Sequence, residues 1–486
     1  MGRQIVPSRP IECNCGGRGG NGADRRAIIR LAPCDSQTGK MLSMTIQAAF
    51  IALALAAAQD SNAPEVWTQA ELESVTEEIR LDLEDLRGES FQRPVSVRIT
   101  DGAGFLTHAK ERVESFTSPE QWDADAMQAK LLGLIPADMD LLATTYELLE
   151  SQVGGFYDPG SDAFYLMEDY TGGLARVILS HELVHALDDQ LYDLDKGMRE
   201  RVASTDALFA YQALCEGSAQ LISTRWVLRN TGTLSQSDLE KASLGAEQLG
   251  DAPAFLWKPL LGAYLAGNDF LDKGYRVRRR ALRKEASHGK TIAEAFATPP
   301  RSSEQVLHPL KYWSAEELDE PIRITHGAAP EGWTERGRTT LGELTLAILV
   351  DDDDALKGPD LTNPRSLLEL SYTNDAAAGW GGDEVVLLSK GDAHVVHLAT
   401  IWDTSDDAHE FYAALKAVEE RIMSVTGELD DSHGVRLDLD LKSPRVSFTS
   451  FVGIDHDTAN ALVGALTVTV EEAAEAAGEL EPAGTK

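Results

Sequence analysis

The sequence predicts an α+β fold: a mainly helical region with a small sheet, followed by a small α+β C-terminal domain. Three observations predict it. Most of the chain between residues 62 and 323 carries apolar residues at helical spacing. Short alternating patterns, typical of strands, interrupt these helices near residues 95–99 and 163–167. Further strand patterns then flank an amphipathic helix at 405–425.

The 486 residues are enough for two or three domains. Residues 1–40, which contain three of the four cysteines and no apolar periodicity, are expected to be disordered or a mispredicted start. Residues 41–58 resemble a signal peptide, since their apolar run is too short to span a membrane and small residues precede Gln59. We therefore expect export to the periplasm or the medium, and membrane attachment only if this segment stays uncleaved. The expected parts after it are a main domain (59–323), a linker (324–340), the C-terminal domain (341–470) and an acidic tail (471–486).

The main domain begins with a predicted helix at 67–86, the strand at 95–99, and helices at 103–117 and 138–151. Residues 154–167 predict a β-hairpin, because Asp-Pro-Gly-Ser-Asp at 158–162 is strong turn chemistry. The second strand of this hairpin contains Phe164, Tyr165 and Leu166 and directly precedes the next helix. Alternate residues of a strand face opposite sides, so Phe164 and Leu166 can simply be core.

That next helix contains His181-Glu182-x-x-His185, the pattern His-Glu-x-x-His. Side chains four residues apart lie one turn above each other, so both imidazoles can reach one tetrahedral Zn²⁺. Glu182 then lies beside the metal, where its carboxylate can take a proton from water. Apolar residues flank the motif at helical spacing, namely Leu174, Val177, Ile178, Val184 and Leu187.

A third ligand must come from elsewhere. The metzincin pattern fails, because Asp188 and Leu191 stand where it needs Gly and His. The best candidate is Glu216, in a second predicted helix at 206–225, because small and apolar neighbours are an unusual setting for a carboxylate. Gly217 would let this helix approach the first one closely. The rival acids Asp188, Asp189 and Asp206 fit better as acceptors for a His N–H.

The motif together with Glu216 resembles a gluzincin, the zinc metallopeptidase type with two His and one Glu. More closely, residues 60–420 resemble a largely uncharacterised group of bacterial metallopeptidases. The shared blocks are GGFYDP (154–159), HELVHALDDQ (181–190), LCEG (214–217), PPRSSEQVLHP (299–309) and GWGGD (379–383). The resemblance implies a zincin-type fold, one zinc ion and hydrolysis of a peptide or protein substrate. It also implies that an edge strand, expected at Phe164–Leu166, binds extended substrate. One departure is Gln220, where many gluzincins carry Asp.

The remaining candidates are weaker. A zinc peptidase needs a donor for the developing oxyanion, and Tyr264 and His308 are the two candidates. Tyr264 can equally be a core ring, and His308 a turn residue before Pro309. The C-terminal domain shows no evident catalytic set, and its His394 and His397 lie on opposite faces of a predicted strand.

The net charge of −35 disfavours a nucleic-acid partner. Two other functions stay open at this point. One is a zinc hydrolase of non-peptide substrates. The other is a non-catalytic metal-binding protein that acts as a binding module.

Overall fold

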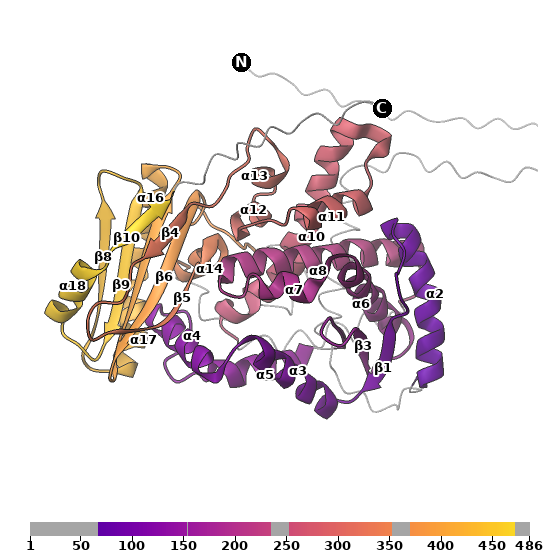
Figure 1. Cartoon of the computed structure of the whole chain (residues 1–486), viewed down its shortest axis with the longest axis horizontal. Helices are drawn as coiled ribbons and strands as arrows, with labels where there is room; N and C mark the ends of the chain where they lie inside the picture. Colours follow the sequence, from indigo (N-terminus) through magenta and orange to yellow (C-terminus); the bar gives the residue numbers. More distant parts are fainter. Residues whose placement is uncertain (1–66, 153, 235–251, 352–369, 472–486) are drawn as a thin grey trace, which may run out of the picture. The chain divides into compact units, whose positions relative to one another are not determined.

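A computed structural model describes residues 67–152, 154–234, 252–351 and 370–471 (Figure 1). The expected disordered start, the signal peptide and nearly all of the acidic tail lie outside these ranges. Within them the protein is α+β, as predicted. None of the helices in these ranges is both long and apolar enough to cross a membrane.

The predicted elements of the N-terminal half are confirmed with small shifts of their ends. They are α2 (Gln69–Arg87), β1 (Ser96–Thr100), α3 (Gly102–Phe116), α5 (Leu141–Gln152), β2 (Gly155–Asp158), β3 (Ala163–Met167), α6 (Gly172–Tyr192) and α8 (Thr205–Arg229). Two helices were not predicted, α4 (Pro119–Leu131) and α7 (Leu194–Arg199). The helical region that follows consists of α10 (Ala254–Leu282), the 3-10 turn η2 (Arg283–Glu285), α11 (His288–Ala297), α12 (Ser303–Leu307) and α13 (Leu310–Trp313).

The first sheet has the strand order β1-β3-β2. β3 pairs in parallel with β1 on one side and antiparallel with β2 on the other. The prediction that Phe164–Leu166 forms an edge strand is therefore wrong, because β3 is the central strand. Phe164 and Leu166 are buried against α6 and its neighbours, so their alternative assignment as core residues is the correct one.

Helices α6, α8 and α10 carry most of the buried apolar residues of this half. Gly217 and Gly267 let α8 and α10 touch, since a Cβ on Gly217 would lie 2.3 Å from the Gly267 carbonyl carbon. The sequence prediction assigned Gly217 to the contact between α8 and α6. In the structure Gly217 instead contacts α10, which packs on the neighbouring face of α8.

The C-terminal half contains a five-stranded antiparallel sheet of order β5-β6-β7-β9-β8 and a two-stranded ribbon, β10-β4 (Figure 1). The elements are β4 (Arg323–His326), β5 (Thr334–Thr339), α14 (Gly342–Leu349), β6 (Trp380–Lys390), β7 (Ala393–Trp402), α16 (Ser405–Ala417), α17 (Glu419–Leu429), β8 (His433–Asp440), β9 (Arg445–Val452), α18 (His456–Ala465) and β10 (Val468–Glu471). The segment 324–340, expected to be a linker, thus supplies most of β4 and all of β5. The helix predicted at 405–425 is two helices that meet at Val418.

The two halves share a core. Buried apolar side chains from Leu72 to Val452 form one continuous cluster. Arg421 of α17 also donates to backbone carbonyls of Gly133 and Leu349. The expected boundary between a main domain and a C-terminal domain therefore does not separate two hydrophobic cores.

Candidate metal centre

The two helices that carry the predicted ligands pack against each other in the core. α6 runs from Gly172 to an αL residue at Asp193, and His181 in its middle is 6 % exposed. Ser204 precedes α8, and its side chain accepts from the Ala207 N–H and caps the helix. Glu216 lies near the middle of α8, so its backbone is held on both sides by helical hydrogen bonds.

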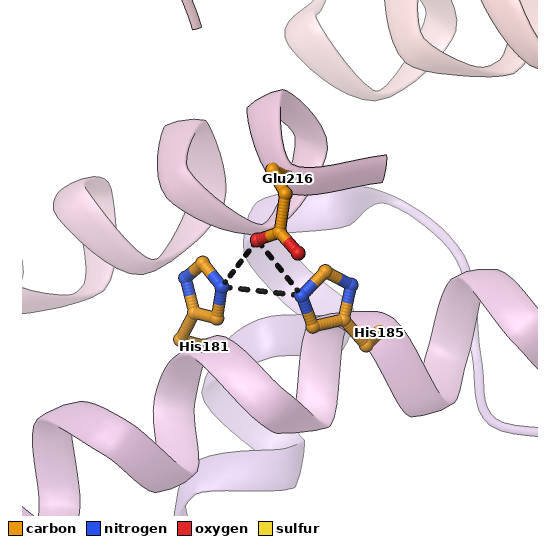
Figure 2. Close-up of side chains that lie close together, drawn as sticks. All are labelled: His181, His185 and Glu216. Carbon is orange, nitrogen blue, oxygen red and sulfur yellow. Dashed lines mark hydrogen bonds and ion pairs between the residues drawn. The ribbon is translucent and has the colours of Figure 1, made fainter. Parts of the chain in front are cut away.

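The side chains of His181, His185 and Glu216 converge on one point between these helices (Figure 2). Glu216 Oε2 lies 3.1 Å from His181 Nε2 and 3.3 Å from His185 Nε2. The two Nε2 atoms lie 3.1 Å apart. The structure therefore brings together the three residues that the sequence singled out as ligands.

These distances fit a zinc ion. Zinc–ligand bonds of about 2.0–2.1 Å in a tetrahedron place neighbouring ligand atoms about 3.3–3.4 Å apart. The observed separations of 3.1–3.3 Å are close to that value. Two imidazoles and one carboxylate are also a known ligand set of catalytic zinc, with one coordination position left open.

The charges of the three side chains favour a cation at this point. Burial alone would raise the pKa of Glu216, but His185 and His181 hold it well below its usual range. Burial alone would lower the pKa of His185, but the carboxylates of Glu216, Glu182 and Asp188 together raise it to about 9. The site thus attracts positive charge, which either protons or a metal ion can supply.

Glu182 lies beside the triad. Its Oε2 accepts a hydrogen bond of 2.8 Å from the Tyr157 backbone N–H on β2. Burial raises the pKa of Glu182, although the neighbouring His185 and His181 oppose this shift. A half-buried carboxylate fixed by one N–H and raised in pKa is suited to accept a proton.

Tyr264 also reaches this site. Its ring stacks on the His181 ring with centroids 5.5 Å apart. Burial raises the pKa of Tyr264 well above its usual value, and the carboxylates of Glu216 and Glu182 raise it further. The hydroxyl therefore stays protonated and can donate a hydrogen bond.

His308 does not lie with the triad. Its Nε2 is 2.8 Å from Glu343 Oε1, and Glu343 is fully buried at the start of α14. Glu343 in turn lies close enough to Asp206 to affect its pKa. Asp206 is ten residues before Glu216 on α8, about 15 Å away along the helix axis. The described contact of His308 is thus with Glu343 and not with the triad, and its role as oxyanion donor stays a prediction.

The prediction that Asp206 and Asp188 accept from a ligand His is also corrected. Asp206 Oδ1 accepts from the Ser303 backbone N–H at 2.7 Å, in the first turn of α8, whereas Glu216 lies near the middle of that helix. Asp188 Oδ1 accepts from Arg87 Nη2 at 3.0 Å, and its Oδ2 accepts from Ser218 Oγ. Both acids join helices, and neither makes a hydrogen bond to His181 or His185 among the described residues.

Sequence reasoning missed the partners that hold the site. Arg87 ends a charged helix and carries no pattern that marks it, yet its side chain is fully buried against Asp188. Tyr157 binds Glu182 through its backbone, which no side-chain pattern reveals. Gln220, one turn after Glu216, is buried and donates to Thr224 Oγ1, while its Oε1 has no partner among the described residues.

A second cluster of possible metal-binding side chains contains Glu304, Asp319 and Asp403. Lys311 Nζ lies 2.6, 2.7 and 3.0 Å from these three carboxylates. The lysine already occupies the centre of the cluster and neutralises part of its charge. We therefore assign no metal to it.

Comparison with known proteins covers only part of the chain. A family model described as Domain of unknown function (DUF8575) matches residues 331–470. No curated protein and no solved structure matches the chain. The matched segment contains the five-stranded sheet and none of the three candidate ligands.

Proposed function

We propose that the chain is a zincin-like, zinc-dependent hydrolase of peptide bonds. The observation that carries the proposal is the convergence of His181 Nε2, His185 Nε2 and Glu216 Oε2 at tetrahedral spacing. When bound, zinc supplies Lewis acidity that polarises a carbonyl and makes water acidic near neutral pH. The remaining steps belong to side chains of this protein.

Glu182 is the general base. Its carboxylate takes a proton from the attacking water as the new C–O bond forms at the substrate carbonyl. It then delivers that proton to the leaving nitrogen as the C–N bond breaks. The Tyr157 N–H keeps the carboxylate oriented between these two transfers. The protonated Tyr264 hydroxyl donates to the oxygen on which negative charge develops.

An extended substrate pairs with β2. This strand therefore has the role of substrate-binding edge strand that the sequence prediction gave to β3. β2 is an edge strand. The Gly154 carbonyl accepts from the Met167 N–H, so in an antiparallel pair Gly155 and Tyr157 direct their backbone groups to the open side. Tyr157 already uses its N–H for Glu182 on that side. An extended peptide added there would lie directly beside the general base.

The test is zinc content and peptide cleavage for the purified full-length chain and for Glu182→Gln. We expect one zinc per chain in both proteins. The wild type should cleave peptides from a mixed library, and a chelator should abolish this cleavage. Glu182→Gln should retain zinc and lose activity by about 10²- to 10⁴-fold, since general acid–base catalysis contributes that much. Glu200→Gln is the matched control and should behave as wild type, because the exposed Glu200 carboxylate lies 3.9 Å from Lys196 Nζ and 3.8 Å from Arg201 Nη1.

Three results would contradict the proposal. Cleavage by Glu182→Gln at the wild-type rate removes the assigned base. One bound zinc without cleavage of any peptide indicates a non-catalytic metal-binding protein. Chelator-sensitive turnover of esters or other amides without peptide cleavage indicates a hydrolase of another substrate class.

A further inference from the structure

Two buried histidines and a glutamate form a hydrogen-bonded chain in the C-terminal half, far from the metal ligands in sequence. Glu384 on β6 accepts from His326 of β4 through both the backbone N–H and Nδ1, the latter at 2.9 Å. His326 Nε2 lies 2.9 Å from His397 Nδ1 on β7. Arg338 lies 3.4 Å from Glu384 and balances its charge. His326 and His397 are 2 % and 4 % exposed.

With both rings neutral, the protons of this chain have one arrangement. The Glu384 carboxylate only accepts, so His326 Nδ1 carries the proton. His326 Nε2 is then a lone pair and must accept from His397 Nδ1–H. His397 Nε2 is consequently left as a lone pair. Burial, followed by the neighbouring His326, lowers the pKa of His397 to about 3, so this ring stays neutral at physiological pH.

His397 lines a cavity of about 300 Å³ between the five-stranded sheet and the β4–β10 ribbon. Its Nε2 makes no hydrogen bond to any residue that the structure describes, although the ring is almost fully buried. The walls come from both layers. Their apolar side chains include Ile324, Ala399, Val463, Leu466 and Val468, and Thr400, Arg445 and Ser447 add polar groups. An apolar cavity of about 150 Å³ already holds a benzene-sized molecule.

The lining also contains two carboxylates, and both already accept hydrogen bonds from neighbouring residues. Asp438 is held by Arg436 through two hydrogen bonds, of 2.6 and 3.1 Å. Asp440 accepts from Lys442 N and Ser443 Oγ in the following turn. A buried acceptor nitrogen beside apolar side chains, with the nearby carboxylates already hydrogen-bonded, fits a neutral molecule with a hydrogen-bond donor better than it fits a metal ion.

We propose that this cavity is a binding site for a small apolar alcohol or phenol, whose hydroxyl donates to His397 Nε2. Glu384 and His326 act as positioning residues that fix the tautomer of His397. The site is independent of the proposed metal centre. It joins the family-matched segment to β4, which lies outside that segment.

The test uses 4-ethylphenol as the probe and 4-ethylanisole, which lacks the hydroxyl donor, as its control. Titrations followed by calorimetry on the full-length chain should show saturable binding of the phenol and at least tenfold weaker binding of the anisole. Nitrogen-15 spectra of protein labelled at histidine should show His397 Nε2 as unprotonated before the probe is added, and its resonance should shift on addition. Both measurements use the wild-type protein, so neither depends on the folding of a variant.

Two variants extend the test. His397→Phe keeps an aromatic ring and removes the acceptor, so affinity for the phenol should fall to that for the anisole. His394 lies on the same strand but on the opposite face, where its Nδ1 is hydrogen-bonded to Ser389 Oγ. The variant His394→Phe should therefore bind the phenol as wild type does. A chelator should leave phenol binding unchanged, which separates this site from the metal centre.

Four results would overturn the proposal. They are a protonated His397 Nε2 in the free protein, equal affinities for the two probes, phenol binding that survives in His397→Phe, and phenol binding that a chelator abolishes. Absence of any phenol binding would overturn it as well. None of these outcomes bears on the zinc content or peptide cleavage that test the proposed function.

Discussion

Replacing Arg87 with Met should destabilise the protein more than any surface change, because Arg87 is the partner of a buried charge. The guanidinium and the Asp188 carboxylate are 0 % and 1 % exposed and lie 3.0 Å apart. Arg87 also donates to the Gly289 carbonyl at 2.9 Å and to Tyr192 Oη at 3.1 Å. The pair therefore ties α2 and α11 to α6.

The size of the destabilisation follows from the Asp188 charge, which stays buried without its partner. Without Arg87, the Asp188 carboxylate keeps only the Ser218 hydroxyl as a hydrogen-bond donor among the described residues. Breaking a buried ion pair on one side costs about 3–5 kcal/mol, because the remaining charge stays desolvated. Replacing both partners by apolar residues removes that penalty. We expect Arg87→Met to cost about 4 kcal/mol and the double variant Arg87→Met/Asp188→Leu to cost less than either single change.

Urea denaturation of the four proteins of this cycle, in the presence of a chelator, measures the coupling without a contribution from bound metal. Zinc titrations of the same proteins provide a second readout. Asp188 joins α6 to Ser218, two residues after Glu216, so losing it should weaken zinc binding by about 10–100-fold. Additive free energies of unfolding, or unchanged zinc affinity in Asp188→Leu, would refute the idea that this pair holds the ligand helices in register.

Three other predictions follow. Glu216→Ala should lose most bound zinc, measured by elemental analysis after dialysis, and a full equivalent of metal would contradict its assignment as a ligand. Gly217→Ala should lower the free energy of unfolding by about 1–3 kcal/mol, since its Cβ would overlap the Gly267 backbone, whereas Gly464→Ala, with no atom within 4 Å of the new Cβ, should not. Burial raises the pKa of Asp206 to about 7, against hydrogen bonds from Ser303 that lower it, so the folded state binds this proton more tightly than the unfolded chain. The stability that Asp206 contributes should therefore fall as pH rises from about 4 to 7, by up to about 4 kcal/mol. The free energy of unfolding of Asp206→Asn, measured by denaturation at each pH, should not show this fall. Parallel pH profiles of the wild type and the variant would contradict the role of Asp206.

The parts of the site that the sequence predicted are those fixed by local geometry. His181 and His185 share a face because a helix places residues four apart one turn above each other. Glu216 stood out because a carboxylate among small and apolar residues needs a buried partner. In both cases a few neighbouring residues determine the prediction.

The parts that could not be predicted depend on contacts between distant segments. Whether β3 is central or at an edge is decided by β1, whose Ser96 pairs with Ala163 far along the chain. Hydrophobic alternation is the same in both positions, so it cannot separate them. The pairing of His326 with His397 likewise depends on the β4–β10 ribbon, whose second strand comes more than 140 residues after its first.

The packing explains residues of two sequence blocks, 299–309 and 379–383. Asp206 at the start of α8 accepts from the Ser303 N–H, which belongs to the block at 299–309. The Asp383 carboxylate, from the block at 379–383, accepts from the N–H groups of Leu341 and Gly342. A Cβ on Gly342 would lie 1.9 Å from Asp206 Oδ1, so that glycine lets the chain pass directly over the end of α8.

Both blocks therefore converge on the N-terminal end of the helix that carries Glu216, about 15 Å from the carboxylate itself. A helix is stiff over that distance, so fixing its first turn also limits where Glu216 can lie relative to α6. Catalytic groups must be held within about 0.5 Å of their productive positions. The residues of these two blocks need not touch a substrate to be required. Their contribution is to position the proposed zinc ligand Glu216 from the N-terminal end of its helix, together with Asp188 and Ser218 near the site.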